Sequence, residues 1–474
     1  MRRGSRVTSS LRDDPVSKDS TASFASAIQD AVGETRPCLI LVAQSGRPLQ
    51  SPLVFPLWNV REVSLTRSAS RDTHTRVEGE QLLLELADGW MSAPHARLVR
   101  EPGGHWRIHD LGSKNGSYLN GTRVSSALLD EGDLIDVGFS FLSLQLQLPQ
   151  ALLLELQLTE AKSEPVTTIC SELYRSLAEL DRIGESKLAV LLSGETGTGK
   201  ELAARRVHAV SGRRGPFIAV NCAAIAGSVA ESELFGFVKG SFTGASEDRQ
   251  GLVRAAHGGT LFLDEVADLD PAIQSKLLRA LQQEEVLPVG STRPVHVDLR
   301  VISASCRDLD ALVASGGFRE DLFARLAGHH VTLPPLRERR EDLCLLVAAL
   351  LKESLQERAG DVRLQREVLR TLYRYDWPRN IRQLKHALEA AVALSDGLEL
   401  RLEHLPSELR QQPLAPPPTE AADDDPLRAQ LAQLLSEHRG NISAVARALG
   451  KERVQIRRWC RRWGLDPDAF RERS

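Results

Sequence analysis

GETGTGKE, residues 194–201, follows the apolar run LAVLLSG and precedes a segment with helical spacing of its apolar residues. A GxxxxGK pattern between a strand and a helix is typical of a phosphate-binding loop. The glycines let backbone N–H groups point at phosphate oxygens, the helix N-terminus adds partial positive charge, and Lys200 can reach the β and γ phosphates. The residues expected to bind the nucleotide are Gly194, Glu195, Thr196, Gly197, Thr198, Gly199, Lys200 and Glu201.

LFLDE, residues 261–265, is the expected partner of this loop because it ends a buried strand with two carboxylates. Asp264 is expected to hold Mg²⁺ through water, and Glu265 to orient or activate the attacking water. The loop carries Glu201 where a Ser or Thr hydroxyl usually binds Mg²⁺, so that ligand is missing. Phosphoryl transfer depends mainly on positioning and charge neutralisation, and these groups suit it.

Four apolar runs predict buried strands with helical stretches between them: LAVLLSG, PFIAVN, GTLFLDE and VDLRVISAS. This order is typical of an α/β fold, in which crossover helices cover a parallel sheet. We expect this domain to span residues 166–410 and to end in a mostly helical lid over about 340–410.

Residues 37–148 predict an all-β domain. The stretch GSKNGSYLNGTRV holds two Asn-Gly turns, which are a strong hairpin signal. FLSLQLQL, residues 141–148, alternates with period two, which predicts a half-buried strand. Residues 1–36 are polar without periodicity and are expected to be disordered, and residues 149–165 are expected to form a linker.

The bulk composition favours a soluble multidomain protein. At roughly 100–200 residues per domain, the length predicts two to four domains. The net charge of −3 gives no whole-chain argument for nucleic acid. Six scattered cysteines without a CxxC pair favour reduced thiols and a cytoplasmic location. The sequence shows neither a secretory signal nor an apolar run long enough for a membrane span.

The C-terminal segment 426–474 is basic, with 11 Lys or Arg residues against five Asp or Glu, and it follows a Pro-rich acidic linker at 411–425. An apolar stripe over 442–449, a break at Gly450 and a second, basic helix fit a helix-turn-helix. Arginine reads guanine edges and phosphates, and glutamine reads adenine. The residues expected to contact DNA are Arg453, Gln455, Arg457, Arg458, Arg461 and Arg462.

Seven ordered blocks resemble the central AAA+ domain of bacterial sigma-54-dependent activators, also called enhancer-binding proteins. These blocks are GETGTGKE, VNCAAI, ESELFGFVKGSFTGA, GGTLFLDEV, GFREDLFARL, LPPLRERREDL and WPRNIRQL. The resemblance implies an ATPase that uses ATP and Mg²⁺. It also implies a homo-oligomeric ring, expected to be a hexamer, that remodels the sigma-54 RNA polymerase holoenzyme.

KGSFTGA, residues 239–245, resembles the family's GAFTGA loop, with Ser241 in place of the first Ala. In the family this loop projects from the ring and touches the sigma factor, so Phe242 and Thr243 are the implied contacts. The residues implied to form the sigma-54 contact are Gly240, Ser241, Phe242, Thr243, Gly244 and Ala245.

Four further roles follow from matching positions. Asn221 resembles the switch asparagine that holds the catalytic glutamate, here Glu265. Arg319 and Arg325 resemble arginines that are presented to the nucleotide of a neighbouring subunit, where such a group stabilises transition-state charge. Arg382 matches the sensor arginine of the lid helices.

MSAPHARL, DLGSKNGSYLNG and the arginine of SLTRS resemble a forkhead-associated (FHA) domain, which binds phosphothreonine peptides. The resemblance implies that Arg67 and Ser92 hold the phosphate. Lys114 and Asn115 are implied to contact the phosphate and the peptide backbone, and His95 to brace the binding loops.

The basic tail resembles a Fis-type DNA-binding domain, so the resemblances imply a three-domain activator that binds upstream (enhancer) double-stranded DNA. Its implied input is a phosphothreonine protein, such as a Ser/Thr kinase. One alternative is a DNA-binding regulator whose ATPase no longer acts on sigma-54, because Arg254 and Cys306 replace residues usual in the family. The other is a phosphoprotein-binding scaffold with an inactive ATPase. The GSFTGA loop argues against the first, and Lys200, Asp264 and Glu265 argue against the second.

Overall fold

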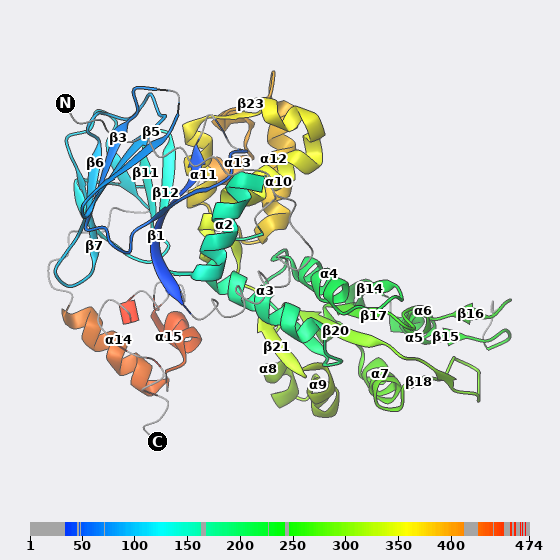
Figure 1. Ribbon diagram of the computed structural model, residues 1–474. Helices are drawn as coiled ribbons and strands as arrows, with labels where there is room; N and C mark the ends of the chain where they lie inside the picture. Colours follow the sequence, from blue (N-terminus) through cyan, green and yellow to red (C-terminus); the bar gives the residue numbers. More distant parts are fainter. Residues whose placement is uncertain are drawn as a thin grey trace, which may run out of the picture.

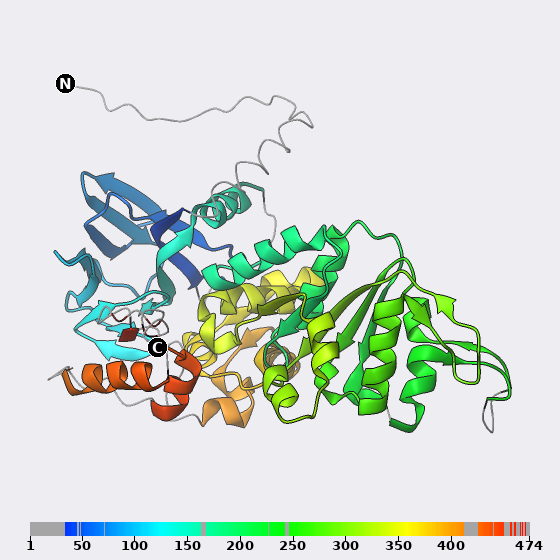
Figure 2. The ribbon, with the colours of Figure 1, turned by 90° about the horizontal axis from the view of Figure 1, so that it is seen from below.

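The computed structural model describes residues 34–44, 47, 49–70, 72–162, 167–225, 227–241, 246–411, 425–438, 440–449, 456, 459, 460, 465, 467 and 470. Figure 1 shows a β-sandwich, a group of lid helices beside it and an α/β domain. In the turned view of Figure 2, the lid helices lie between the sandwich and the α/β domain. Within the described residues, no helix has the length and apolar character needed to cross a membrane.

The sandwich consists of two six-stranded sheets with the orders β2-β1-β12-β11-β8-β9 and β10-β7-β6-β3-β5-β4. Every second side chain of the central strands points between the sheets, where Leu39, Leu65 and Leu142 are fully buried. The strands are β1 (Thr35–Gln44), β2 (Leu53–Pro56), β3 (Glu62–Arg67), β4 (His74–Glu78), β5 (Gln81–Leu86), β6 (Ala96–Arg100), β7 (Trp106–Asp110), β8 (Ser117–Leu119), β9 (Thr122–Val124), β10 (Ser126–Leu129), β11 (Leu134–Val137) and β12 (Ser140–Pro149).

The N-terminal expectation of disorder over 1–36 lies outside the described residues except for its last three positions, because β1 begins at Thr35. The strand expected over 141–148 is confirmed as β12, but the expectation that it is half-buried is wrong. Ser143 and Gln145 of β12 are each 1% exposed, since the outer face of their sheet packs against the lid and not against water. The amide of Gln145 donates to the Ser143 hydroxyl at 3.0 Å, which satisfies both buried groups.

The segment expected to be a linker contains helix α2 (Gln150–Lys162), which continues directly from β12. Leu152, Leu153 and Leu156 of this helix belong to the same buried cluster as the lid residues. This part of the chain is therefore packed into the molecule, because its apolar side chains are removed from water.

The α/β domain has the expected parallel sheet, with the strand order β14-β17-β20-β13-β21. Two short hairpins, β15–β16 and β18–β19, extend from the end of this domain that lies away from the sandwich (Figure 1). The strands are β13 (Val190–Ser193), β14 (Phe217–Asn221), β15 (Gly236–Phe237), β16 (Arg249–Gln250), β17 (Thr260–Asp264), β18 (Glu285–Val286), β19 (Val295–His296), β20 (Arg300–Ser305) and β21 (His329–Thr332). The helices are α3 (Ser171–Gly184), α4 (Lys200–Val210), α5 (Gly227–Phe235), α6 (Leu252–Ala255), α7 (Pro271–Gln283), α8 (Leu309–Ala314) and α9 (Glu320–Leu326).

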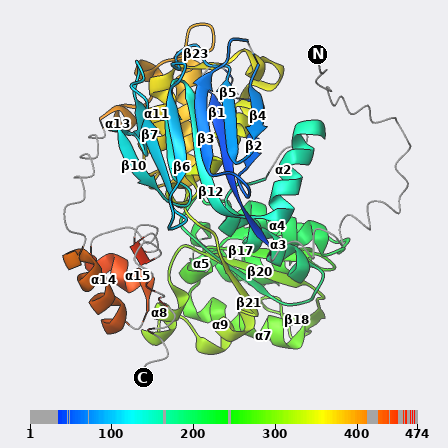
Figure 3. The same cartoon turned by 60° about the vertical axis from the view of Figure 1, so that its left-hand side comes forward.

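The lid is mostly helical and stands behind the strands of the sandwich in Figure 3. Its elements are α10 (Leu343–Leu355), β22 (Arg363–Leu364), α11 (Arg366–Arg374), α12 (Asn380–Leu394), β23 (Glu399–Leu400) and α13 (Ser407–Arg410). Trp377, between α11 and α12, is 1% exposed, and its indole N–H donates to the carbonyl of Leu372 at 2.9 Å. This bond fixes the connection between the two helices.

The C-terminal part contains helices α14 (Asp425–Glu437) and α15 (Ile442–Leu449). The expected apolar stripe is present, because Val445 and Ala446 of α15 pack against Leu431 and Leu435 of α14. The side chain of Asn441 accepts hydrogen bonds from the first N–H groups of α15 and so caps the helix. The second helix of the expected helix-turn-helix lies almost entirely outside the described residues.

Candidate functional site

The phosphate loop connects the end of β13 at Ser193 to the start of α4 at Lys200, as the sequence predicts. Gly197 has a φ of +82°, and a Cβ atom at this position would clash with the carbonyl oxygen of Arg379 in the lid. Only glycine fits there, because it tolerates positive φ and leaves room for the lid backbone. The same glycine accepts a hydrogen bond from the N–H of Ile381 at 3.0 Å, so loop and lid are in direct contact.

Lys200 is 6% exposed and points back into the phosphate loop. Its ammonium group donates to the carbonyls of Gly194 at 2.9 Å and Glu195 at 3.3 Å. It also lies 3.7 Å from Oε1 of Glu265, at the end of β17. The structure therefore brings the lysine of the first motif and the glutamate of the second motif into one charged pair.

Asp264 and Glu265 lie at the carboxyl end of the parallel sheet, where ligands bind in open α/β folds. Glu265 has a φ of +52°, a strained conformation for a non-glycine residue, and its Oε2 accepts the N–H of Cys306 at 3.0 Å. Burial raises the pKa of Asp264, and the neighbouring charge of Glu265 adds to this, while Lys200 opposes it. A cation beside Asp264 would stabilise the charged carboxylate and so oppose both of the effects that raise its pKa.

Magnesium would have one protein carboxylate here. The described residues contain no cluster of three or more His, Cys, Asp or Glu side chains able to hold a metal by themselves. Mg²⁺ in phosphoryl-transfer sites needs less, because one or two carboxylates plus substrate phosphates and water suffice. Asp264 fits that role, whereas Glu201 pairs with Arg205 at 2.7 Å on the outer face of α4. Glu201 therefore does not replace the missing hydroxyl ligand.

Asn221 does not make the contact expected of it. Its side-chain oxygen accepts the N–H groups of Ala223 at 3.0 Å and Ala224 at 3.2 Å, which caps the short turn after β14. Asn221 and Glu265 are both in the described part of the chain, and no hydrogen bond joins them there. The local N–H groups compete successfully for this acceptor.

Two lid contacts on the phosphate loop were missed by the sequence reasoning. Asn380, which is fully buried, accepts the N–H of Leu336 at 2.7 Å and donates to Glu195 and to the carbonyl of Thr196, each at 3.1 Å. Arg337 forms a two-pronged ion pair with the same Glu195 at 2.7 and 2.8 Å. Such paired geometry is the strong form of an arginine–carboxylate contact.

Thr198 and Arg382 are two further residues expected to bind the nucleotide. Thr198 is buried, and its hydroxyl donates to the carbonyl of Glu195 at 2.9 Å. Arg382, the expected lid sensor, has its backbone against Gly197 and its side chain exposed. It is thus near the phosphate loop but makes no hydrogen bond to it within the described residues.

Arg319 and Arg325 lie at the two ends of α9 on the exposed surface. Arg319 forms a two-pronged pair with Asp321 at 2.7 and 3.0 Å, which raises its pKa. Arg325 donates to the carbonyl of Leu281 at 3.0 Å. Neither guanidinium contacts the phosphate loop or the carboxylates of β17 within the described residues.

The loop expected to contact sigma-54 emerges from the hairpin of β15 and β16. Gly240 and Ser241 are described, and Ser241 packs against Gly290 of the neighbouring hairpin. Phe242, Thr243, Gly244 and Ala245 lie outside the described residues. The same holds for the expected DNA contacts Arg453, Gln455, Arg457, Arg458, Arg461 and Arg462.

The expected phosphopeptide residues lie at one end of the sandwich, where Arg67 ends β3 and the other three are on loops. The N–H of Lys114 donates to the Ser92 hydroxyl at 3.0 Å, and the N–H of Arg67 donates to the Ser92 carbonyl at 3.2 Å. Asn115 donates to the carbonyl of Trp90 at 2.7 Å. The fold thus brings all four residues together, with the side chains of Arg67 and Lys114 exposed.

His95 braces these loops from beneath. It is fully buried, and its Nδ1 accepts the N–H of Ser92 at 3.0 Å. Its backbone N–H donates to the carbonyl of Leu65, and its carbonyl accepts the N–H of Leu111, each at 3.0 Å. Burial lowers the pKa of His95, which favours the neutral ring that this acceptor role requires.

The phosphate loop, the acidic end of β17 and the lid that contacts both define a P-loop domain of the AAA+ class, joined here to an FHA-type sandwich. Three family models match the chain: Sigma-54 interaction domain over residues 167–332, AAA+ ATPase lid domain over 337–422, and FHA domain over 75–138. The transcriptional regulatory protein GlrR of Escherichia coli is 38% identical, over 65% of this chain and 70% of that protein. The chain belongs to the family of sigma-54-dependent transcriptional regulators.

Two further relatives and one solved structure also match this chain over part of its length. The hydrogenase transcriptional regulatory protein HoxA of Cupriavidus necator is 41% identical over 65% of this chain. The chain spans 66% of HoxA and 47% of the acetoin catabolism regulatory protein of the same organism, so it matches about half to two thirds of these relatives. A solved structure of NtrX from Brucella abortus in complex with ATP is 32% identical, covers 66% of this chain and 73% of that chain, and has a TM-score of 0.48.

Proposed function

We propose that this protein is an ATP-dependent transcriptional activator that acts in the cytoplasm and remodels the sigma-54 RNA polymerase holoenzyme to open promoters. The observation that carries the proposal is the pairing of Lys200 with Glu265 at 3.7 Å, in a domain that also presents the loop beginning at Gly240. A nucleotide-handling centre and a projecting loop on one domain are the two parts that ATP-driven remodelling requires.

The chain's own residues divide the work at the nucleotide. Lys200 would leave the loop carbonyls and bind the β and γ phosphates of ATP, and Glu265 would orient the attacking water. Asp264 would hold Mg²⁺, which when bound neutralises phosphate charge and orients the leaving group. Asn221 would exchange its local N–H partners for Glu265 during the cycle.

Hydrolysis would require a neighbouring copy of the chain. Arg319 and Arg325 are exposed on α9 and make no contact with the phosphate loop of their own chain within the described residues. Their guanidinium groups would complete the site of the next subunit in a homo-oligomeric ring, which we propose to be a hexamer. An arginine supplied in this way is worth about 10³–10⁵ in rate.

The residues that would bind sigma-54, DNA and a phosphothreonine protein lie in different parts of the chain. Phe242 and Thr243 would contact sigma-54, and the C-terminal arginines would bind upstream double-stranded DNA. Arg67, Ser92, Lys114 and the neighbouring Asn115 would bind a phosphothreonine protein, such as a Ser/Thr kinase. Phosphate offers charge and several acceptors, which match two exposed cations beside hydroxyl and amide donors.

Strand separation at a promoter tests the proposal. The purified protein is mixed with sigma-54 polymerase and a template that carries its upstream DNA, with and without ATP. We expect opening only with ATP, and no opening or hydrolysis by Lys200→Ala. ATP hydrolysis by the wild-type protein without opening would favour a regulator that no longer acts on sigma-54, and absence of hydrolysis would favour a scaffold.

A further inference from the structure

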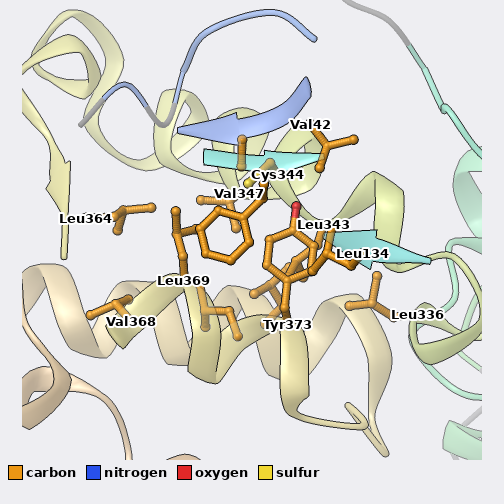
Figure 4. Close-up of a cluster of buried hydrophobic side chains, with 14 of the residues drawn as sticks. Val42, Leu134, Leu336, Leu343, Cys344, Val347, Leu364, Val368, Leu369 and Tyr373 are labelled. Atoms are coloured by element: carbon orange, nitrogen blue, oxygen red, sulfur yellow. The ribbon is translucent and has the colours of Figure 1, made fainter. Parts of the chain in front are cut away.

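The sandwich and the lid share one hydrophobic core. In an antiparallel sandwich the outer face of a sheet is commonly in water. Here Ile40, Leu134 and Phe141 point outward from β1, β11 and β12, yet all three are buried against lid residues. Figure 4 shows Val42 and Leu134 of the sandwich facing Tyr373 of α11. The ring of Tyr373 stacks on Phe141 with a centroid distance of 5.3 Å.

One carboxylate lies within this apolar contact. Asp136 of β11 is paired through Oδ1 with Arg366 at 3.1 Å and through Oδ2 with Arg370. The side chain of Asp136 is 3% exposed, and those of the two arginines are 8% and 16% exposed. The guanidinium carbon of Arg370 also lies 3.9 Å from the ring centre of Tyr118 in β8, a cation–π contact.

The arginines recur every fourth residue on α11, so they lie on one face of the helix. A third member of this row, Arg374, donates to the carbonyl of Gly121 in the turn after β8. Within the described residues, Nε of Arg366 and Nη2 of Arg370 are buried without an acceptor. Such orphan donors are costly, so this contact is not arranged for maximal stability.

The cluster of Asp136, Arg366 and Arg370 is connected through aromatic side chains to the loops expected to bind phosphopeptide. Asn115 donates to the carbonyl of Trp90, and the Trp90 ring packs on Phe139 with a centroid distance of 4.9 Å. The Phe139 ring is in turn 6.0 Å from the guanidinium carbon of Arg366. Tyr118, which contacts Arg370, is three residues beyond Asn115. Two chains of contacts therefore connect these loops to α11.

The C-terminal end of α11 is also connected to the phosphate loop. Arg340, which precedes α10, donates to the carbonyl of Tyr373 at 3.0 Å and to Asp376 at 2.8 Å. Trp377 donates to the carbonyl of Leu372, so the helix end is tied to the segment that follows it. That segment ends at Asn380, whose side chain holds Glu195 and Thr196 of the phosphate loop. Helix α11 therefore contacts the sandwich directly and is connected to the phosphate loop through the segment 375–380.

We propose that the Asp136 cluster couples the FHA domain to the nucleotide site, so that a phosphopeptide on the FHA loops and ATP on the phosphate loop alter each other's affinity. The phosphopeptide half of this inference rests on the function proposed above. Each ligand acts by shifting how α11 is held between Asp136 and the phosphate loop. Coupling of two binding equilibria is reciprocal, so the nucleotide must also change the sandwich.

The test uses the full chain and Asp136→Asn, which keeps the shape of the side chain and removes the only carboxylate of the cluster. Glu78→Gln is the matched control, because Glu78 is an exposed FHA carboxylate paired with Arg76 on the far sheet. The dissociation constant of a non-hydrolysable ATP analogue and hydrogen exchange of residues 134–137 and 366–374 are measured for each protein.

We expect Asp136→Asn to speed exchange in both segments and to change the nucleotide dissociation constant by at least about fivefold, the lower end of ordinary coupling. Glu78→Gln should do neither. In the wild-type protein the ATP analogue should alter exchange over 134–137. Faster exchange in Asp136→Asn with an unchanged dissociation constant, or no response of 134–137 to the nucleotide, would overturn the coupling.

If Asp136→Asn does not fold, Arg370→Gln takes its place, because it leaves one arginine for the one carboxylate. The phosphopeptide half is measured with a phosphothreonine peptide library. A peptide that binds wild type should shift the affinity for the ATP analogue, and this shift should vanish in the cluster variant. Peptide binding without any shift would overturn the inference but keep the proposed FHA function. Absence of peptide binding would end that function, while the nucleotide measurements would still decide the coupling.

Discussion

Asn380 offers the sharpest test of how the lid positions the phosphate loop. Its side chain joins three segments through one acceptor bond and two donor bonds. Its φ of +53° also favours Asn or Gly over Ala. The informative change is Asn380→Gly, because glycine keeps this backbone conformation without strain while losing all three side-chain bonds.

The expected magnitudes differ for stability and for binding. The buried N–H of Leu336 loses the Asn380 acceptor, which costs the folded lid about 1–3 kcal/mol. The two bonds to Glu195 and to Thr196 hold the phosphate loop directly, and each contributes about 1 kcal/mol. If both are needed for the binding geometry, ATP affinity falls by about thirtyfold, since about 1.4 kcal/mol corresponds to a factor of ten.

The assay combines an equilibrium titration of ATP with thermal unfolding. Asn380→Ala should bind ATP as weakly as Asn380→Gly and lose about 1–2 kcal/mol more stability, because alanine is strained at this φ. His386→Ala is the control, since His386 is on the same helix and exposed. If Asn380→Gly unfolds earlier but binds ATP with wild-type affinity, Asn380 supports only the lid, and the argument about the loop is refuted.

Three further outcomes are expected. Arg325→Ala should not hydrolyse ATP, and mixing it with Lys200→Ala should restore activity. The Lys200→Ala protein supplies the arginine, and the Arg325→Ala protein supplies the intact nucleotide pocket. Mixed rings without activity would refute this. Arg67→Ala should abolish phosphothreonine peptide binding without unfolding the sandwich, as titration and circular dichroism would show; retained affinity would move the site elsewhere. In the double variant Arg457→Ala and Arg458→Ala, the slope of log K for DNA binding against log salt concentration should become shallower by about 0.9 for each lost phosphate contact. An unchanged slope would show that neither arginine contacts the DNA.

The phosphate loop and the acidic strand end could be predicted because each is a contiguous motif with a fixed local geometry. Lys200 and Glu265 are far apart in sequence, but each follows a strand of one parallel sheet and thus arrives at the same edge. The hydrogen bond from Asn380 to Glu195 could not be predicted, because 185 residues separate the two and only the packing of the lid on the phosphate loop brings them together.

The shared core of sandwich and lid was missed for a different reason. Period-two alternation over 141–148 shows that a strand has two unlike faces, but it does not say whether the second face meets water or another domain. The signal that was available is CLILVA, residues 38–43, in which β1 is apolar on both faces. A strand of this kind is typical of a sheet that is covered on both sides.

We propose that ATP hydrolysis is transmitted to sigma-54 polymerase through the loop at 239–245. The most direct measurement compares ATP turnover with strand separation at a sigma-54 promoter for the wild type and for Phe242→Ala. We expect near-normal turnover without opening in Phe242→Ala, because the loop carries no group that acts on phosphate. Normal promoter opening by Phe242→Ala, or no ATP-dependent opening by the wild type, would contradict it.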